Sequence, residues 1–327
     1  MSTNEFATKP LGRTGREVSA VGIGTAFLGR ARNQPTDITP GEFVLDPELG
    51  VEALTAGLDA GITLVDTAPF YRTEPFVGEA LRQTKVDRSQ ITVMTKAGRP
   101  GVGDFSFAAD DIKRHVEGSL ERLGLDYIDV VSIHDAVHEG VDYIMSDKGA
   151  FGALRQLRDE GVIGAIGSAC YDPNLNAQYL ETGEFDVAIC SASWSMINLT
   201  LRERVLPAAR KHNVGLVIGE PLERGLLAVG YQPGRTYADR NFSQPVLDRV
   251  QEIQDLCARH DLRILDVGLH WLVREAQVAA SIPGAATPEE AVANADVNRV
   301  HISDEFWAEL EPLITPWTHA DLGIEIK

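Results

Sequence analysis

The chain has few cysteines, and their spacing excludes two common uses of this residue. Only 3 of the 327 residues are cysteine, at Cys170, Cys190 and Cys257, and no CxxC pair is among them. A disulfide framework or a cysteine-rich zinc site is therefore not expected. The first ten residues lack the apolar segment of a secretory signal, and no apolar run is long enough to span a bilayer. We expect a cytoplasmic protein without a membrane-spanning segment.

Positive charge is also scarce. The sequence has 30 Lys and Arg against 48 Asp and Glu, which gives a net charge of −18. Nucleic acids and anionic lipids both need a basic surface, so neither partner is expected. Of the 8 histidines, only His134 ends an apolar run, which argues against a metal hydrolase site. We expect no metal and a small-molecule substrate as the partner, while no pattern indicates an oligomeric state.

The glycine pattern of a Rossmann dinucleotide fold is missing. After the first apolar run the sequence reads Gly22-Ile23-Gly24-Thr25-Ala26-Phe27, and no glycine completes GxGxxG. Short apolar runs rich in Val and Ile instead alternate with longer amphipathic segments, which predicts a parallel sheet with helices between the strands. The expected strands are Val21–Thr25, Ile62–Val65, Ile91–Met94, Ile128–Ile133, Val162–Ile166, Val187–Ile189, Val214–Ile218 and Val278–Ile282.

Eight strand–helix units favour closure into one (β/α)8 TIM barrel, and 327 residues is an ordinary length for that fold. We therefore expect an α/β fold with a single domain over residues 1–327. Residues 10–18 predict an N-terminal β-hairpin, with Thr14-Gly15 at its turn, that closes the bottom of the barrel. The expected helices are Pro47–Ala60, Asp110–Leu123, Phe151–Glu160, Leu201–His212, Pro245–His260 and Ile264–Arg274.

Polar residues that end the apolar runs are the candidates for chemistry, because a barrel carries its site at the carboxyl ends of its strands. Asp66 ends the second run, with Tyr71 in the following loop, Lys96 ends the third and His134 the fourth. Tyr71 is the candidate acid or base, and the ammonium of Lys96, kept charged by Asp66, is expected to lower the pKa of Tyr71. His134 would hydrogen-bond a substrate oxygen or assist the proton transfer. This set suits the interconversion of an alcohol and a carbonyl.

Motifs over nearly the whole chain resemble the aldo-keto reductase family. The matching segments are GI at 61–62, DTAPFY at 66–71, VGEAL at 77–81, TK at 95–96, SLERLGLDYID at 119–129 and IH at 133–134. The resemblance implies a (β/α)8 barrel, an NAD(P)-dependent enzyme acting on CH–OH groups, and a catalytic tetrad of Asp66, Tyr71, Lys96 and His134.

The same resemblance implies a nicotinamide dinucleotide, bound without a Rossmann fold. Trp194 stands where the family usually has an aromatic that stacks on nicotinamide, although packing in the core is the alternative. Ser168-Ala169-Cys170 and Ser191 depart from the family pattern, so the way in which the nicotinamide amide is held stays open. The candidate cofactor-binding residues are Gly24, Thr25, Ser168, Ser191, Trp194, Glu220, Leu222, Gly225, Gly284, Thr287, Glu290 and Asn294.

The segment after the last strand bears on the choice of cofactor. NADP-preferring members carry Lys and Arg there, whereas this chain has Gly284-Ala285-Ala286 and, at the usual Arg position, Glu290. A carboxylate repels a 2′-phosphate and accepts hydrogen bonds from a ribose hydroxyl. We therefore expect NAD to be preferred over NADP. The alternative is that Glu290 only caps the following helix.

The rim of the expected substrate pocket combines aromatic and polar side chains from Phe27, Phe70, Arg72 and Trp317 with the long loop Leu28–Asp46. Such a pocket suits a sugar-like or heteroaromatic substrate. FDV at 185–187 and GLLA at 225–228 resemble the branch of the family with aldose 1-dehydrogenases and pyridoxal 4-dehydrogenase. This implies oxidation of a sugar or sugar-like hemiacetal to a lactone. Pyridoxal 4-dehydrogenase activity, NADPH-type aldehyde reduction and a non-catalytic, redox-sensing cofactor-binding subunit stay open as alternatives, and the intact tetrad argues against the last.

Overall fold

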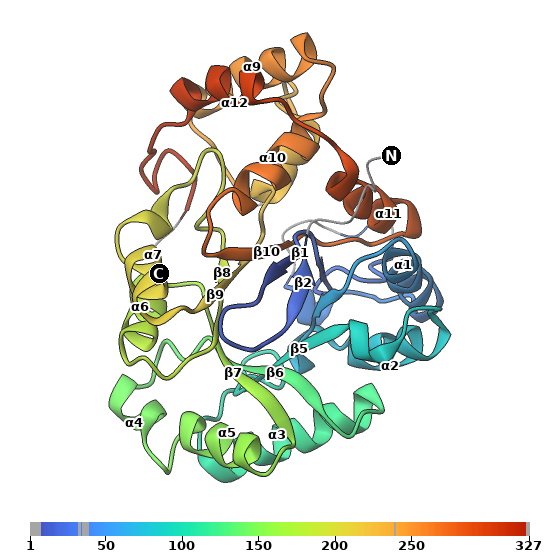
Figure 1. The fold of residues 1–327 in the computed structure, drawn as a ribbon, viewed down its shortest axis with the longest axis vertical. Coiled ribbons are helices and arrows are strands. Elements are labelled where there is room, and N and C mark those ends of the chain that lie inside the picture. Colours follow the sequence, from blue (N-terminus) through green and yellow to red (C-terminus); the bar gives the residue numbers. More distant parts are fainter. Residues whose placement is uncertain (1–7, 32–33, 35–38, 239, 325–327) are drawn as a thin grey trace.

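The structure is a computed structural model that describes residues 8–31, 34, 39–238 and 240–324. Within these ranges eight parallel strands form one sheet in which neighbours in space are neighbours in sequence, and helices surround the strands (Figure 1). This confirms the predicted barrel. The strands are β3 (Ile23–Gly24), β4 (Leu64–Asp66), β5 (Thr92–Ala97), β6 (Ile128–His134), β7 (Ile163–Cys170), β8 (Val187–Ser191), β9 (Gly215–Gly219) and β10 (Val278–Ile282).

The first and last strands meet and bring the sheet nearly to closure. Val21 forms a parallel bridge with Ser281, and Gly24 forms another with Gly284. Between them, the backbone N–H of Gly22 donates to the carbonyl of Ser281 at 2.8 Å. Because these are isolated bridges rather than a continuous ladder, only Ile23–Gly24 of the predicted first strand is regular.

The helices begin and end at residues that suit their termini. Asp46 caps α1 by accepting a hydrogen bond from the N–H of Leu49, and Gly124 ends α3 in the left-handed conformation. The segment predicted as Leu201–His212 is helical only from Val205, because Thr200–Arg202 forms a 3-10 turn. The helices are α1 (Pro47–Asp59), α2 (Glu74–Gln83), α3 (Ala109–Leu123), α4 (Val141–Met145), α5 (Ala150–Asp159), α6 (Pro173–Glu181), α7 (Val205–His212), α8 (Leu226–Val229), α9 (Gln244–Arg259), α10 (Ile264–Val273), α11 (Pro288–Asp296) and α12 (Asp304–Leu310).

The strands contribute to two layers of core. On β6, Val130 belongs to the cluster inside the barrel, whereas Val131 belongs to a cluster between strands and helices. Successive side chains of a strand point to opposite faces, and both faces of these strands are buried, which explains their continuous apolar runs. The interior cluster consists of Leu11, Val18, Leu64, Met94, Val130, Ala165, Ala169, Val187, Ile189, Val217, Ala279, Ala280 and Ile282.

The N-terminal hairpin closes the amino end of the barrel, as the sequence predicts. Its strands are β1 (Thr8–Pro10) and β2 (Glu17–Ser19), paired antiparallel. Leu11 is fully buried in the interior cluster. Gly12 has φ +55°, and a Cβ there would lie 2.3 Å from the backbone nitrogen of Gly215, so glycine is required. With this end filled, access to the interior is left at the carboxyl ends of the strands.

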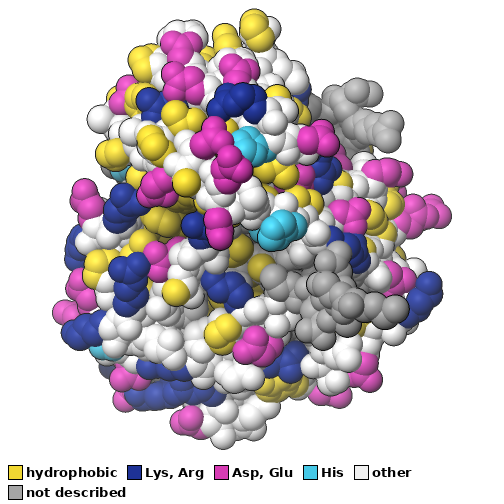
Figure 2. All heavy atoms as spheres, turned by 45° about the horizontal axis from the view of Figure 1, so that its top comes forward, with side chains coloured by type: hydrophobic (Ala, Val, Ile, Leu, Met, Phe, Trp, Pro, Cys, Tyr) yellow, Lys and Arg dark blue, Asp and Glu magenta, His cyan; other side chains and the backbone are white. Residues whose placement is uncertain are grey.

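The surface carries charges of both signs. On the face drawn in Figure 2, acidic and basic side chains are interspersed with apolar ones. None of the helices in the described ranges combines the length and apolar composition that a membrane crossing needs. The middle of the predicted Leu28–Asp46 loop, residues 32–33 and 35–38, lies outside the described residues.

Candidate active site

A cavity of about 330 Å³ opens at the carboxyl ends of the strands. The four residues that the sequence singles out for chemistry, Asp66, Tyr71, Lys96 and His134, all line it. They come from β4, the turn after it, β5 and β6, three strands that are adjacent in the sheet. The order of the strands therefore brings together four residues that are up to 68 positions apart in the sequence.

Asp66 and Lys96 form a buried ion pair at the base of the cavity. The Lys96 Nζ donates to both carboxylate oxygens of Asp66, at 2.8 and 2.6 Å, and to the carbonyl of Thr67 at 2.8 Å. Both side chains are almost fully buried. Three acceptors occupy the three N–H donors of an ammonium, so the charge of Lys96 is fixed in position.

Tyr71 lies over this pair. It ends the 3-10 turn Pro69–Tyr71, and Arg72 follows with φ 61°, which reverses the chain. The Lys96 Nζ is 4.8 Å from the centroid of the Tyr71 ring, and the ring of His134 meets that of Tyr71 edge to face at 6.1 Å. The phenol, the ammonium and the imidazole therefore face one small volume of the cavity.

The pKa of Tyr71 differs from the sequence-based expectation. Burial, followed by the carboxylates of Asp66, Asp135 and Glu220, raises this pKa well above its usual value, and only Arg99 opposes the shift appreciably. The lowering expected from Lys96, whose ammonium is paired with both oxygens of Asp66, is outweighed by these effects. The phenol therefore holds its proton at neutral pH.

His134 is the neutral partner of this phenol. Burial, and then the charges of Lys96 and Arg99, lower its pKa well below the usual value. In the described part of the chain no group pairs with its buried Nδ1. A neutral imidazole carries one N–H donor and one acceptor, so His134 can hydrogen-bond a substrate oxygen without a net charge.

A second ion pair lines the cavity, and the sequence reasoning missed it. The Arg99 Nη1 donates to Asp135 Oδ2 at 3.0 Å, and the Arg99 guanidinium lies over the ring of Phe70 at 3.9 Å. Asp135 also accepts from the backbone N–H of Tyr171 at 3.2 Å. Their positions in the sequence could have indicated a role, because both follow candidate catalytic residues near strand ends. Asp135 directly follows His134, and Arg99 lies three residues after Lys96.

Four of the predicted cofactor residues line the cavity: Gly24, Ser191, Glu220 and Gly284. They lie at the ends of β3, β8, β9 and β10, on the side where Arg224 also lines the wall. Gly219 leaves room here, since a Cβ would come within 2.6 Å of the Ser191 Oγ. Open strand ends beside a guanidinium fit a nicotinamide dinucleotide, whose pyrophosphate is anionic and needs close approach to backbone.

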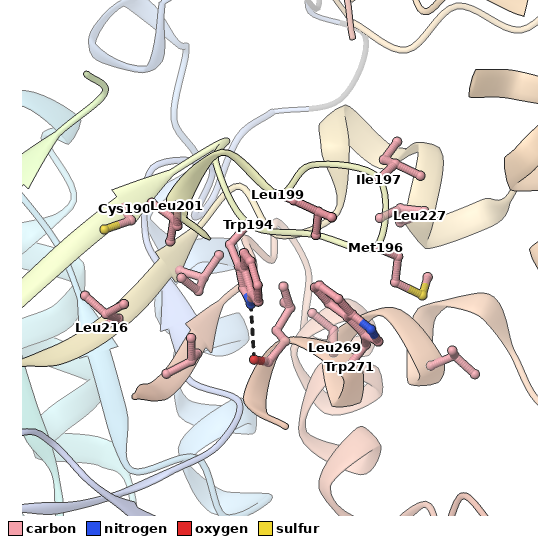
Figure 3. Close-up of a cluster of buried hydrophobic side chains, with 14 of the residues drawn as sticks. Cys190, Trp194, Met196, Ile197, Leu199, Leu201, Leu216, Leu227, Leu269 and Trp271 are labelled. Carbon is pink, nitrogen blue, oxygen red and sulfur yellow. Dashed lines mark hydrogen bonds between the residues drawn. The ribbon is translucent and has the colours of Figure 1, made fainter. Parts of the chain in front are cut away.

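Trp194 lies in the core instead of the cavity wall. Its ring packs against Trp271, with centroids 5.0 Å apart, and its Nε1 donates to the carbonyl of Leu272 at 3.4 Å (Figure 3). Two other predicted cofactor residues are likewise buried in protein contacts. Ser168 donates to Asn176 Oδ1 at 2.8 Å, and the hydroxyl of Thr25 pairs with that of Thr73 at 2.9 Å.

The predicted adenosine segment forms the start of α11. Thr287 caps this helix by accepting from the N–H of Glu290, and the Glu290 carboxylate accepts from the N–H of Ala286 at 2.8 Å. This arrangement is close to a capping box. Asn294 donates to the carbonyl of Gly284 at 3.2 Å and so ties the helix to the cavity wall. Glu290 therefore caps α11, while its side chain stays exposed.

The loop after β9 is held by a buried ion pair. Glu220, Glu223, Arg224 and Gly225 have positive φ values of 51°, 46°, 54° and 95°. Glu223 is almost fully buried and accepts from the Ser195 Oγ at 2.8 Å, and its Oε2 lies 3.5 Å from Arg240 Nη1. The predicted cofactor residues Leu222 and Gly225 belong to this loop, outside the cavity wall, and Leu222 packs on the core.

Two of the four predicted substrate-pocket residues line the cavity, namely Phe27 and Phe70. Arg72 does not; its side chain is exposed and donates to the carbonyl of Phe43. Trp317 does not line it either, and is partly buried against a core cluster. The structure thus brings together the tetrad, two aromatic rings and the Arg99–Asp135 pair.

Comparison with known proteins places the chain in a family. The aldo/keto reductase profile matches residues 20–315. The NADH-specific methylglyoxal reductase of Escherichia coli (strain K12) is 31% identical over 320 residues, which cover 90% of this chain and 94% of that protein. The D-threo-aldose 1-dehydrogenase of a Pseudomonas species is 28% identical over 338 residues, covering 95% and 97%.

A solved structure has the same fold. The holo form of an aldo-keto reductase from Bacillus halodurans matches with a TM-score of 0.76 and 24% identity, covering 95% of this chain and 97% of that one. The profile match spans most of the barrel, including all four residues of the tetrad. The chain therefore belongs to the aldo/keto reductase family, whose members are NAD(P)-dependent oxidoreductases.

Proposed function

We propose that this protein is a dehydrogenase that oxidises the hemiacetal of an aldose, or of a sugar-like molecule, to a lactone. The observation that carries the proposal is the group of charged and hydroxyl-bearing side chains beside the tetrad. The cavity wall combines the Asp66–Lys96 and Arg99–Asp135 ion pairs with the hydroxyl of Tyr71. The cavity of about 330 Å³ also includes the strand ends proposed for the cofactor, so the space beside the tetrad suits a small molecule such as a pentose or hexose.

The tetrad is proposed to move one proton. Tyr71, in its phenolate form, accepts the proton of the anomeric hydroxyl, and neutral His134 donates a hydrogen bond to the same oxygen and orients it. Lys96, fixed by Asp66, holds a positive charge 4.8 Å from the centroid of the Tyr71 ring, which favours the phenolate that accepts this proton. A bound nicotinamide dinucleotide supplies the acceptor for the hydride that leaves the anomeric carbon.

The cofactor is proposed to lie over the ends of β8, β9 and β10. Ser191, Glu220 and Gly284 would contact it there, with Asn294 holding Gly284 in place. We propose a preference for NAD, supported by the carboxylates of Glu289 and Glu290 in the first turn of α11. Glu290→Gln is then expected to lower the ratio of the NADP⁺ dissociation constant to the NAD⁺ dissociation constant. Glu117→Gln on α3 is the control, and a wild-type preference for NADP⁺ would overturn the choice.

Carbonyl reduction is the second candidate, because one observation favours it. The raised pKa of Tyr71 keeps the phenol protonated, and a protonated phenol is the form that donates to a carbonyl oxygen. The name of the methylglyoxal reductase relative agrees with that direction. The two candidates share the tetrad and differ in substrate and direction.

One assay separates these readings. NAD⁺ and NADP⁺ reduction is followed by absorbance with aldoses and pyridoxal, and NADH and NADPH oxidation with methylglyoxal. Turnover of an aldose that is lost in Tyr71→Phe supports the proposal. Turnover only with methylglyoxal identifies a reductase, and turnover only with pyridoxal identifies a pyridoxal dehydrogenase. Tight cofactor binding without turnover in either direction would identify a redox-sensing subunit.

A further inference from the structure

We propose that Arg99 and Asp135 together bind the hydroxyl groups next to the reacting carbon and thereby select polyhydroxylated substrates. This inference rests on the proposed function and names the feature of the substrate that the cavity recognises. Both side chains line the cavity and come from the ends of β5 and β6.

Arg99 and Asp135 lie directly beside the tetrad. The Asp135 Oδ2 is 3.7 Å from His134 Nε2, and the Arg99 guanidinium covers the ring of Phe70. That ring in turn meets both Tyr71 and His134 edge to face, at 5.9 and 6.1 Å. A substrate whose reacting oxygen contacts Tyr71 and His134 therefore presents its neighbouring carbons to this ion pair.

Arg99 and Asp135 also have hydrogen-bonding capacity that the protein does not use. The Arg99 side chain is 21% exposed, and within the described ranges its Nη2 forms no hydrogen bond. Its Nη1 is used by Asp135. The two Asp135 oxygens accept one hydrogen bond each, from Arg99 and from the N–H of Tyr171, and a carboxylate accommodates about four. The pair thus offers both a donor and acceptors to a ligand.

The chemistry of the ligand follows from that combination. A hydroxyl accepts from a guanidinium and donates to a carboxylate, so adjacent hydroxyls satisfy both groups. A small dicarbonyl offers acceptors only and leaves Asp135 unmatched. A carboxylate substrate is attracted by Arg99 but repelled by Asp135. A diol is the group that fits both members of the pair.

The fold also holds the backbone of Asp135 in the left-handed region. Its φ is 50°, in the left-handed region that non-glycine residues rarely adopt. Hydrogen bonds from its N–H to the carbonyl of Ala169, at 2.8 Å, and from Tyr171 to its side chain keep it there. Local strain of this kind concentrates at ligand-binding sites.

The test compares sugars that differ by one hydroxyl. The probes are D-arabinose and 2-deoxy-D-ribose, assayed with the wild type, Arg99→Met, Asp135→Asn and the double variant. The matched controls are Arg13→Met and Asp186→Asn, because Arg13 and Asp186 form a comparable pair, 2.8 Å apart, beside the N-terminal hairpin at the other end of the barrel. Thermal unfolding of each variant checks that it is folded.

We expect the wild type to have a kcat/KM about 10- to 100-fold higher for D-arabinose than for 2-deoxy-D-ribose. In each single variant the kcat/KM for D-arabinose should fall while that for 2-deoxy-D-ribose stays the same, so that most of the ratio is lost. The double variant should have a ratio only slightly lower than the single variants, and the controls should have the wild-type ratio. Equal losses for both sugars would assign the pair a structural role and overturn the inference. The inference would also be overturned if the wild type preferred D-glucuronate over D-arabinose and Arg99→Met abolished that preference. This result would identify an anion site.

Calorimetric binding of the sugars distinguishes this inference from the proposed function. One outcome would overturn the proposed function and support the inference. In it, D-arabinose is not turned over but binds more tightly than 2-deoxy-D-ribose, and Asp135→Asn weakens the binding of D-arabinose. Turnover of D-arabinose with an unchanged hydroxyl preference in every variant would do the reverse. Binding of neither sugar to the wild type would overturn both.

Discussion

Replacing Arg240 with methionine removes the charged partner of a buried carboxylate next to the candidate cofactor loop. Glu223 is 1% exposed, and its Oε2 lies 3.5 Å from Arg240 Nη1. Ser195 still donates to the other oxygen, at 2.8 Å. The variant therefore leaves the carboxylate, which has no access to water, with Ser195 and Asn198 as hydrogen-bond partners and Arg224 as a more weakly coupled positive charge.

Breaking one side of a buried pair costs roughly 3–5 kcal/mol, since the remaining charge is desolvated without compensation. Burial already raises the pKa of Glu223, and Arg240 is the main group that opposes this shift. Without Arg240 the Glu223 carboxyl should take up a proton at a higher pH than in the wild type. The loss of unfolding free energy in Arg240→Met should therefore be smaller at acidic pH than at neutral pH. Glu223→Gln/Arg240→Met removes both charges and should recover most of the lost stability.

Urea unfolding of the wild type, the single variant and the double variant measures these differences. Titration of NAD⁺ by protein fluorescence should also show weaker binding in Arg240→Met, because the loop of Glu220–Gly225 contains four residues with positive φ that need to be held in place. A single variant within about 1 kcal/mol of the wild type would refute the reasoning, as would a double variant that is no more stable than the single one.

Three further predictions follow from the structure. Because the pKa of Tyr71 is raised, the phenolate needed for oxidation grows with pH, so kcat for oxidation should increase from about pH 7 to about pH 10 while kcat for reduction stays level; a level oxidation profile would contradict the role of Tyr71 as base. Leu11→Ala should lower the unfolding free energy by about 2–5 kcal/mol and leave KM unchanged, since Leu11 fills the end of the barrel away from the cavity; a changed KM would argue against that separation. Trp194→Ala should cost about 3–5 kcal/mol of stability with an unchanged NAD⁺ dissociation constant, because the indole packs on Trp271; a large loss of NAD⁺ affinity in a folded variant would instead indicate stacking on nicotinamide.

The barrel and the tetrad were accessible from the sequence for a physical reason. Strands buried on both faces need uninterrupted apolar runs, and a polar residue that ends such a run marks the rim of the barrel. Asp66, Lys96 and His134 end three consecutive runs and meet in the cavity. The hairpin was predictable from its turn residues in the same way.

Other features depend on contacts that a linear pattern does not contain. The position of Trp194 in the core follows from the path of the chain after β8 and from Trp271 on α10. The direction of the pKa shift of Tyr71 depends on its burial and then on the carboxylates of Asp66, Asp135 and Glu220, which come from three different strand ends. Arg99 and Asp135 stand near strand ends in the sequence, but only the fold shows that they pair with each other. The single-domain organisation and the preference for NAD stay predictions.

The central claim is tested most directly by following one hydrogen atom. An aldose deuterated at C1 is incubated with the enzyme and NAD⁺, and the sugar product and the reduced cofactor are analysed by NMR. The account predicts a lactone product, deuterium on the nicotinamide, and loss of both in Tyr71→Phe. Deuterium retained at C1, or transfer undiminished in Tyr71→Phe, would contradict it.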